Sequence, residues 1–192
     1  MNKHESKYFN TASLFDEALI SLLQKKDIEY ITIKEICNMA SVNRSTFYLH
    51  YENIDDLLNE TLEYITKKLI GYFNIEPSDF IESIDYSDKS DLNFINEKYL
   101  RPYLEFVKDN KKVFIAAFKN PSAMNCQEQY YNLEKYILYP ILDKYNIPDE
   151  KKKYFLRFYV NGIMGIVKEW AIGDCIEDID IILDIIMTCV KP

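Results

Sequence analysis

Residues 43–50 hold most of the side chains in this 192-residue chain that could do recognition chemistry: Asn-Arg-Ser-Thr-Phe-Tyr-Leu-His. A guanidinium such as that of Arg44 can bond two acceptors on the edge of a guanine, and hydroxyl groups suit phosphate oxygens. Catalysis has less support. The chain has only two histidines, His4 and His50, and it has no Gly-x-Ser-x-Gly, no glycine-rich phosphate loop and no metal-ligand spacing. We therefore expect no enzyme, no cofactor and no metal.

Two short helices joined by a tight turn must position these side chains. The first should run over about 33–40, because Thr32 stands where an N-cap belongs and Glu35 follows at the capping-box spacing. A polar break at 41–43 comes next, and Asn43 can cap the second helix. A helix, a turn of about three residues and a second helix form the arrangement that places the second helix in a DNA major groove.

A third helix should begin at Ile54, capped by Asn53 and with two aspartates in its first turn. The whole stretch from Thr32 to Leu58 resembles the N-terminal DNA-binding segment of the TetR family of bacterial repressors. The shared pattern is T-I-x-E-I-x-x-x-A-x-V-x-x-x-T-F-Y-x-H-Y-x-x-x-x-D-L-L, and Thr-Phe-Tyr-x-His-Tyr is its most specific part. This resemblance is specific over roughly the first quarter of the chain and implies an all-α fold.

The chain departs from the family pattern at three positions. Related sequences generally have a glycine near Asp27 and another near Ser41, and both are missing here. Family members also commonly place a phosphate-binding lysine at the position of Ile54. We therefore expect DNA binding to depend on the second motif helix and on the pairing of two subunits.

The motif assigns distinct roles to the residues of the second helix. Phe47 should point into the core of the head, and Arg44 is our candidate for reading a base. The alternative is a plain three-helix packing unit, in which Tyr48, His50 and Tyr51 are core or rim residues. For His50 alone, packing at a helix end is as good an interpretation as a phosphate contact. The residues expected to contact DNA are Lys7, Thr32, Asn43, Arg44, Ser45, Thr46, Tyr48 and His50.

Composition favours a globular helical protein, with 48% hydrophobic and 28% charged residues but only four glycines. Residues 1–51 hold six basic and six acidic side chains, so the rest of the chain carries the whole net charge of −8. A neutral head is mild evidence against tight non-specific DNA binding. The four cysteines have no close pairs and fit buried thiols. The N-terminus is polar and no segment reaches the length of a membrane span, so we expect a cytoplasmic protein.

Apolar periodicity of about 3.6 predicts helices throughout, with a kink or break at Pro102. We expect a helix-turn-helix domain at 1–53, a connecting helix at 54–75, and a regulatory and dimerisation body at 76–192. The expected helices outside the motif are 11–26, 54–73, 93–108, 111–119, 127–145, 149–172 and 176–190.

One helix-turn-helix reads too few base pairs for useful specificity, so such proteins pair on a palindrome. The resemblance implies that the last two helices of each subunit form a four-helix bundle. The alternative is that both apolar stripes are intrachain core. The residues expected at the dimer interface are Phe155, Phe158, Tyr159, Gly162, Ile166, Trp170, Ile179, Ile182, Leu183 and Ile186.

Aromatic residues cluster between positions 99 and 139, a region that surrounds a small-molecule pocket in the family. Aromatic walls with hydroxyl tips suit a mostly apolar ligand, although ordinary helical core explains any single residue equally well. The expected pocket residues are Tyr99, Tyr103, Phe106, Phe114, Phe118, Tyr130 and Tyr131.

The sequence therefore predicts a homodimeric transcriptional repressor that a small molecule releases from a palindromic DNA operator. The alternative is a helix-turn-helix regulator whose body docks a protein partner instead of a small ligand.

Overall fold

The computed structural model describes residues 3–73, 79, 81–82, 84, 95–124, 131 and 134–190, apart from the side chains of 3–7, 73, 136 and 137. All regular structure in these residues is helical, so the predicted all-α class is confirmed. The helices are α1 (Lys3–Leu23), α2 (Ile33–Ala40), α3 (Arg44–His50), α4 (Ile54–Phe73), α6 (Glu97–Asp109), α7 (Lys111–Lys119), α9 (Tyr139–Lys144), α10 (Asp149–Ile172) and α11 (Ile179–Val190). A 3₁₀ turn (Ile28–Tyr30) precedes α2, and a π-helical turn (Glu134–Leu138) leads into α9.

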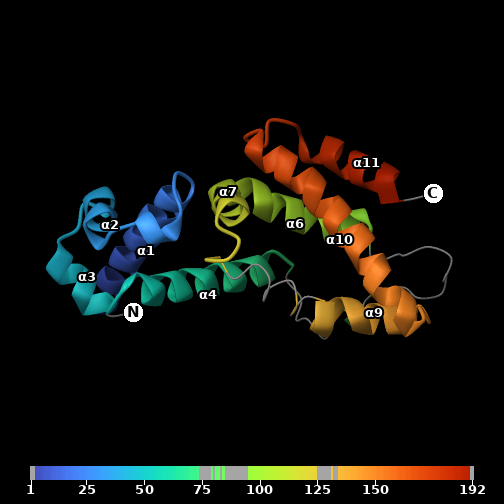
Figure 1. Ribbon diagram of the computed structural model, residues 1–192, viewed down its shortest axis with the longest axis horizontal. Coiled ribbons are helices and arrows are strands. Elements are labelled where there is room, and N and C mark those ends of the chain that lie inside the picture. Colours follow the sequence, from blue (N-terminus) through green and yellow to red (C-terminus); the bar gives the residue numbers. More distant parts are fainter. Residues whose placement is uncertain are drawn as a thin grey trace.

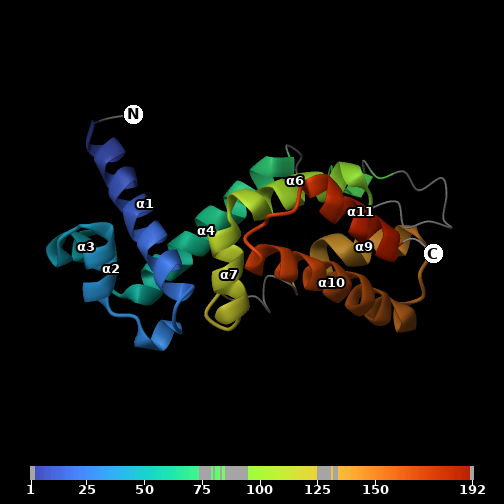
Figure 2. The ribbon, with the colours of Figure 1, turned by 90° about the horizontal axis from the view of Figure 1, so that it is seen from above.

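The described helices form an elongated molecule with two ends (Figures 1 and 2). A head made of α1, α2, α3 and the first half of α4 lies at one end, and a body containing α6, α9, α10 and α11 lies at the other. Helix α4 runs from the head to the body, while α7 stands between them. Helix α1 lies at the head end of the long axis, and α11 lies at the body end.

Local signals in the sequence determine how the motif helices begin and end. Thr32 and Glu35 form the predicted capping box at the start of α2. Helix α2 ends at Ala40, and its C-cap residue Ser41 has a left-handed φ of 54°, whereas Asp27 is extended at φ −68°. Asn53 caps α4 by accepting the backbone N–H of Asp56 at 2.9 Å. Asn43 is the N-cap residue of α3, as predicted, but its side chain makes no capping hydrogen bond.

The head has a hydrophobic core to which the body contributes. Phe47 is fully buried there, as predicted. Ala116 of α7 and Met124, just beyond α7, belong to the same cluster, and Val113 packs against it. Its buried members are Phe15, Ala18, Leu19, Ile20, Leu22, Leu23, Ile31, Ile36, Cys37, Ala40, Phe47, Tyr51, Leu57, Leu58, Ala116 and Met124. The head core therefore extends beyond the boundary expected between residues 75 and 76.

A second cluster, the body core, joins α6, α10 and α11. Phe114 and Phe118 pack against it from α7, so opposite sides of this one helix serve the two cores. Its buried members are Ile95, Leu100, Leu104, Val107, Val167, Trp170, Ala171, Cys175, Ile182, Leu183 and Ile186. Helix α7 therefore packs against both cores.

Polar contacts fasten the head to α7. The Asn120 side chain, only 6% exposed, donates to the carbonyl of Leu23 at 2.8 Å and accepts the N–H of Ile28 at 3.2 Å. Next to it, the Lys119 ammonium donates to the carbonyl of Gln24 at 2.6 Å. These bonds cap the backbone groups at the end of α1, which that helix cannot satisfy internally.

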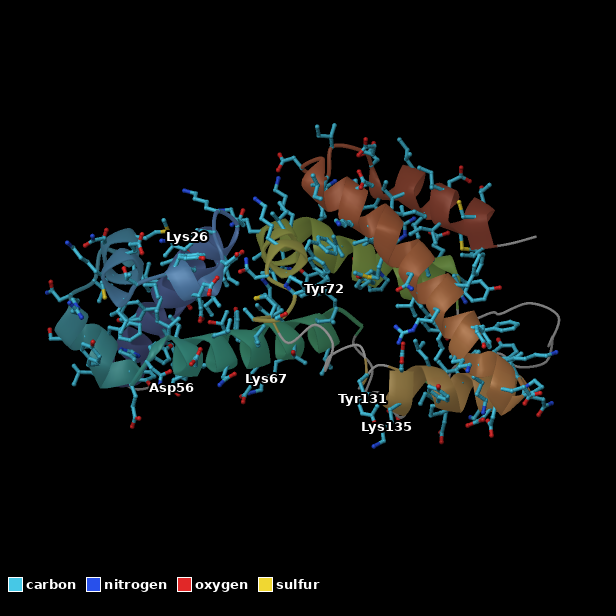
Figure 3. All side chains as sticks on the ribbon, viewed as in Figure 1. Lys26, Asp56, Lys67, Tyr72, Tyr131 and Lys135 are labelled. Atoms are coloured by element: carbon cyan, nitrogen blue, oxygen red, sulfur yellow. The ribbon has the colours of Figure 1, made fainter. Side chains whose placement is uncertain are left out.

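A further pair of contacts joins α4 to the corner between α6 and α7. Lys68 donates to the side-chain oxygen of Asn110 at 2.8 Å. The Tyr72 hydroxyl, labelled in Figure 3, donates to Asp109 at 2.7 Å. Asp109 raises the pKa of Tyr72 because its carboxylate favours the protonated phenol. Together with Asn120, these contacts hold α7 at both of its ends.

Several helix boundaries differ from those expected. The first helix begins at Lys3 and ends at Leu23, earlier at both ends than predicted, and the last begins at Ile179. Helix α6 continues through Pro102 without a break. Pro140 lies in the first turn of α9, where its missing N–H costs little. The remainder of the segment expected to be helical at 127–145 lies mostly outside the described residues.

Candidate nucleic-acid interface

Helix α3 presents one exposed face and one buried face. Arg44, Ser45, Tyr48 and Leu49 are exposed, with Tyr48 at 53% and Leu49 at 80%. At 100° per residue these positions span one continuous arc. Phe47 lies on the opposite side and is fully buried in the head core. The burial of Phe47 therefore fixes which α3 side chains face outward.

Arg44 and Tyr48 act as a pair on this exposed arc. The Arg44 guanidinium donates to the Tyr48 hydroxyl at 3.3 Å, across one helical turn. A guanidinium held at one nitrogen still has free N–H groups for a ligand. Tyr48 thus partly orients the Arg44 guanidinium, which remains a hydrogen-bond donor at the surface of the head.

The neighbouring start of α2 is occupied by its own capping box. Glu35 accepts both the hydroxyl and the backbone N–H of Thr32, at 2.8 and 3.0 Å. It also accepts the Lys26 ammonium at 2.7 Å. Lys26, and then Thr32, lower the pKa of Glu35 to about 2. Both donors of Thr32 are engaged, so this geometry does not support the expected phosphate contact from Thr32.

His50 is a packing residue in this structure. Its ring stacks on Tyr8 at 4.0 Å between centroids, and its edge meets Phe15. Its Nδ1 is buried without a hydrogen-bond partner. Burial lowers the pKa of His50, so the ring is neutral near pH 7. The packing interpretation left open for His50 is therefore favoured over the phosphate contact.

The other expected DNA contacts differ in exposure. Asn43 and Ser45 are exposed, whereas Thr46 is half-buried. The side chain of Lys7 lies outside the described residues. Ile54, which stands where the family commonly has a lysine, packs against the head core. Its hydrophobic neighbours explain why an apolar residue suits this position.

The residues expected at the dimer interface do not share one face. Trp170, Ile182, Leu183 and Ile186 are at most 5% exposed and belong to the body core, which favours the alternative that these four are intrachain core. Tyr159, Ile166 and Ile179 also pack against that core, and Phe155 is half-buried. Phe158 and Gly162 are exposed.

The exposed side of α10 carries a second apolar stripe. Tyr154, Phe158 and Ile172 are 65, 67 and 56% exposed and lie on the same side of the helix as Gly162 and Gly165. A Cβ placed on either glycine would meet no atom within 4 Å. On α11, Ile181 and Ile185 are exposed as well. The sequence prediction included Phe158 and Gly162 but missed Tyr154 and Ile172, although the spacing of three, four and seven positions along α10 was a visible signal.

The residues expected to form the ligand pocket fall into two groups. Phe114 contacts Tyr103, Phe106 and Phe118 with ring centroids 5.8 to 6.4 Å apart, and the Tyr103 hydroxyl donates to the Met164 sulfur at 3.2 Å. Tyr99 is in a separate cluster with Ile84, Ile141 and Tyr145.

The last two pocket candidates are Tyr130 and Tyr131. Tyr131 is exposed beside Lys135 (Figure 3), and Tyr130 lies outside the described residues. A surface depression of about 260 Å³ instead lies between α6 and α11. Its lining is Glu97, Arg101, Asp180, Leu183, Asp184 and Met187, and none of the predicted pocket residues is among them.

Comparison with known proteins identifies the class. Residues 96–192 match a family model described as a transcriptional regulator C-terminal region of TetR type. Over 102 residues the chain is 32% identical to YxbF of Bacillus subtilis (strain 168), an uncharacterized HTH-type transcriptional regulator. The chain belongs to the TetR family of transcriptional regulators.

The matches to this chain cover different shares of the two relatives. The match to YxbF takes in 51% of this chain but only 24% of that relative. The dihydroxyacetone kinase operon activator DhaS is similar with a TM-score of 0.48 and 18% identity, over 94% of this chain and 96% of that chain. Among the described residues, no helix has the length and apolar character needed to cross a bilayer.

Proposed function

We propose that this chain is a homodimeric repressor that binds a palindromic DNA operator, with one α3 helix in the major groove of each half-site. The observation that carries the proposal is the exposed arc of α3, because burial of Phe47 directs Arg44, Ser45 and Tyr48 away from the head. Repression is the mode that the resemblance to bacterial repressors implies.

Within this arc, Arg44 is the residue best suited to read a base. Its guanidinium can bond the O6 and N7 acceptors of a guanine, and Tyr48 limits the orientations that it samples. Asn43 and Ser45 are exposed next to it and can reach phosphates or base edges. The neutral head offers little non-specific attraction, so the affinity depends on these direct contacts and on avidity.

A second copy of the chain is the proposed partner for the exposed side of α10. Tyr154, Phe158 and Ile172 leave a large apolar surface in water, and two glycines between them allow another helix to approach closely. Ile181 and Ile185 are exposed apolar residues on the neighbouring helix α11. Exposed apolar residues on both of these helices suit the four-helix bundle that the family resemblance implies.

The proposed release by a small molecule acts through α7. Its aromatic residues fill the space against the body core, while Val113 and Ala116 pack on the head core. A ligand that enters the aromatic group must displace α7, because close-packed interiors transmit such shifts. Asn120 and Lys68 would pass that displacement to α1 and α4, and so change the spacing of the two α3 helices.

A gel shift on the promoter region beside the chain's own gene tests DNA recognition. We expect the wild type to retard this duplex. Arg44→Ala should weaken specific binding by about 1–3 kcal/mol per half-site and relax the preference at one base pair. Lys112→Ala, which removes an exposed charge from α7, is the control and should bind as the wild type does. Unchanged affinity and sequence preference in Arg44→Ala would contradict the readout assignment.

Sedimentation of purified variants tests the dimer. Phe158→Glu places a charge in the proposed interface and should convert the dimer to a monomer. Tyr64→Glu is the matched control, because Tyr64 is a 55% exposed aromatic residue on α4, away from this surface. A wild-type monomer, or equal dissociation of both variants, would exclude α10 as the interface.

A larger side chain in the aromatic group can test the proposed release from the operator even though the ligand is not identified. Phe114→Trp overfills the aromatic group behind α7 and should weaken operator binding while leaving the dimer intact. Tyr64→Trp, at an exposed aromatic position on α4 outside the aromatic group and the proposed interface, is the control and should leave operator binding unchanged. Equal operator affinity in the wild type and Phe114→Trp would argue against coupling through α7.

A further inference from the structure

The recognition helix carries one large apolar side chain that the head does not use. Leu49 is 80% exposed, as exposed as any large hydrophobic residue in the described part of the chain. It is absent from the buried and the partly buried members of the head core. A single exposed leucine is ordinary on most protein surfaces, but Leu49 stands on the recognition helix.

That position is on the proposed reading face. Leu49 lies one turn beyond Ser45, and 200° around the helix from the buried Phe47. Arg44 and Tyr48 occupy one edge of the exposed arc, whereas Ser45 and Leu49 occupy the other. If α3 enters a major groove, Leu49 enters it together with Arg44.

The major groove offers a leucine only one apolar partner. Each base pair presents hydrogen-bond donors and acceptors there, and thymine alone adds a methyl group at C5. Contact between the two would remove apolar surface of both from water. A polar base edge facing Leu49 would instead lose its hydration without gaining a hydrogen bond.

We propose that Leu49 determines specificity for a thymine by packing on its C5-methyl group. This inference rests on the proposed insertion of α3 into the groove. Arg44 and Leu49 are five residues apart, or about 7.5 Å along the helix axis. The thymine should therefore lie within about three base pairs of the guanine that Arg44 reads, at the base-pair rise of about 3.4 Å.

The experiment begins with the full-length protein and a random duplex library, from which bound sequences are selected. The selected consensus duplex is then made with each thymine replaced in turn by deoxyuridine, which removes only the methyl group. We expect one thymine in each half-site to be sensitive, with affinity falling about fourfold per half-site, the value of one buried carbon group. Replacing both should therefore cost about sixteenfold.

Variants identify the side chain responsible. Leu49→Ala should bind the thymine and deoxyuridine duplexes equally while keeping its dependence on the guanine. Leu14→Ala is the control, because Leu14 is an exposed leucine on α1, outside the arc, and it should keep the methyl sensitivity. Leu49 is exposed, so its replacement should leave the thermal midpoint unchanged.

Two results would overturn the inference about Leu49 while leaving the proposed DNA-binding function intact. One is a wild-type affinity that no deoxyuridine replacement changes, and the other is a Leu49→Ala variant that remains methyl-sensitive at the same base pair. If no sequence is enriched from the library, the proposed DNA-binding function fails and this inference fails with it. The outcomes are therefore distinguishable.

Discussion

The recognition helix α3 and the long helix α10 bury their side chains differently. Helix α3 has a single buried face, and apart from Leu49 the residues opposite Phe47 are polar or carry a polar tip. Helix α10 has two apolar faces. One contains Val167 and Trp170 in the body core, and the other contains Phe158 and Ile172 in solvent.

This difference shows which surface is complete within one chain. The apolar side of the head helices is covered by the head itself and by α7. The outer side of α10 has no such cover among the described residues, and nothing approaches a Cβ built on Gly162 or Gly165. A polar outer face suits a hydrated ligand such as DNA, whereas an apolar outer face suits a second protein surface.

The largest expected change in the free energy of unfolding comes from replacing a phenylalanine on α3, and a phenylalanine on α10 provides the comparison. Phe47→Ala removes a fully buried ring from the head core and should lower the free energy of unfolding by about 3–5 kcal/mol. Phe158→Ala removes a 67% exposed ring and should act only by weakening the dimer. Urea unfolding at several protein concentrations measures both.

Concentration dependence separates the two variants. The loss in Phe47→Ala should be the same at every concentration, whereas the loss in Phe158→Ala should shrink as the protein is diluted and the wild type also dissociates. A loss in Phe158→Ala that persists in monomeric protein would break the distinction between the two faces.

A smaller loss of stability is expected when the hydrogen bonds between the end of α7 and the end of α1 are removed. Asn120→Ala leaves the carbonyl of Leu23 and the N–H of Ile28 without their side-chain partners, at a cost of about 1–3 kcal/mol. Hydrogen exchange should rise at the end of α1. Lys119→Ala removes a neighbouring bond made by a side chain in solvent and should cost less. Equal stability of the wild type and Asn120→Ala would show that the two regions are not fastened here.

The smallest expected change in stability concerns the turn between α2 and α3. Ser41→Gly should stabilise the chain by less than about 1 kcal/mol, because glycine adopts the left-handed conformation without the steric cost that serine carries, and this gain exceeds its greater loss of chain entropy. Asp27→Gly should give no gain, since Asp27 is extended. Thermal midpoints of the two variants test this difference, and a gain in both would contradict it.

Local chemistry made much of the head predictable. The spacing of Thr32 and Glu35 predicted the capping box, and the motif predicted the burial of Phe47. Asn43 was correctly predicted as the N-cap residue of α3, but residue type does not determine whether the side chain forms a hydrogen bond there. His50 was ambiguous because only the structure places Tyr8 against its ring.

The body was less predictable because an apolar stripe does not say what covers it. Trp170 and Ile186 were assigned to an interface from their spacing, but the chain buries them itself. The aromatic residues expected around one pocket lie in separate groups, since Tyr99 and Phe114 face different neighbours. Such pairings depend on how α6, α7 and α10 cross, which periodicity does not encode.

The stoichiometry of the protein–DNA complex tests the central claim most directly. Sedimentation of the full-length protein with its selected duplex gives the number of chains bound, and the Phe158→Glu variant provides the comparison. We expect two chains per duplex for the wild type and, for Phe158→Glu, binding weakened to that of a single head. One wild-type chain per duplex, or undiminished binding by Phe158→Glu, would contradict the account of a dimer that reads DNA through α3.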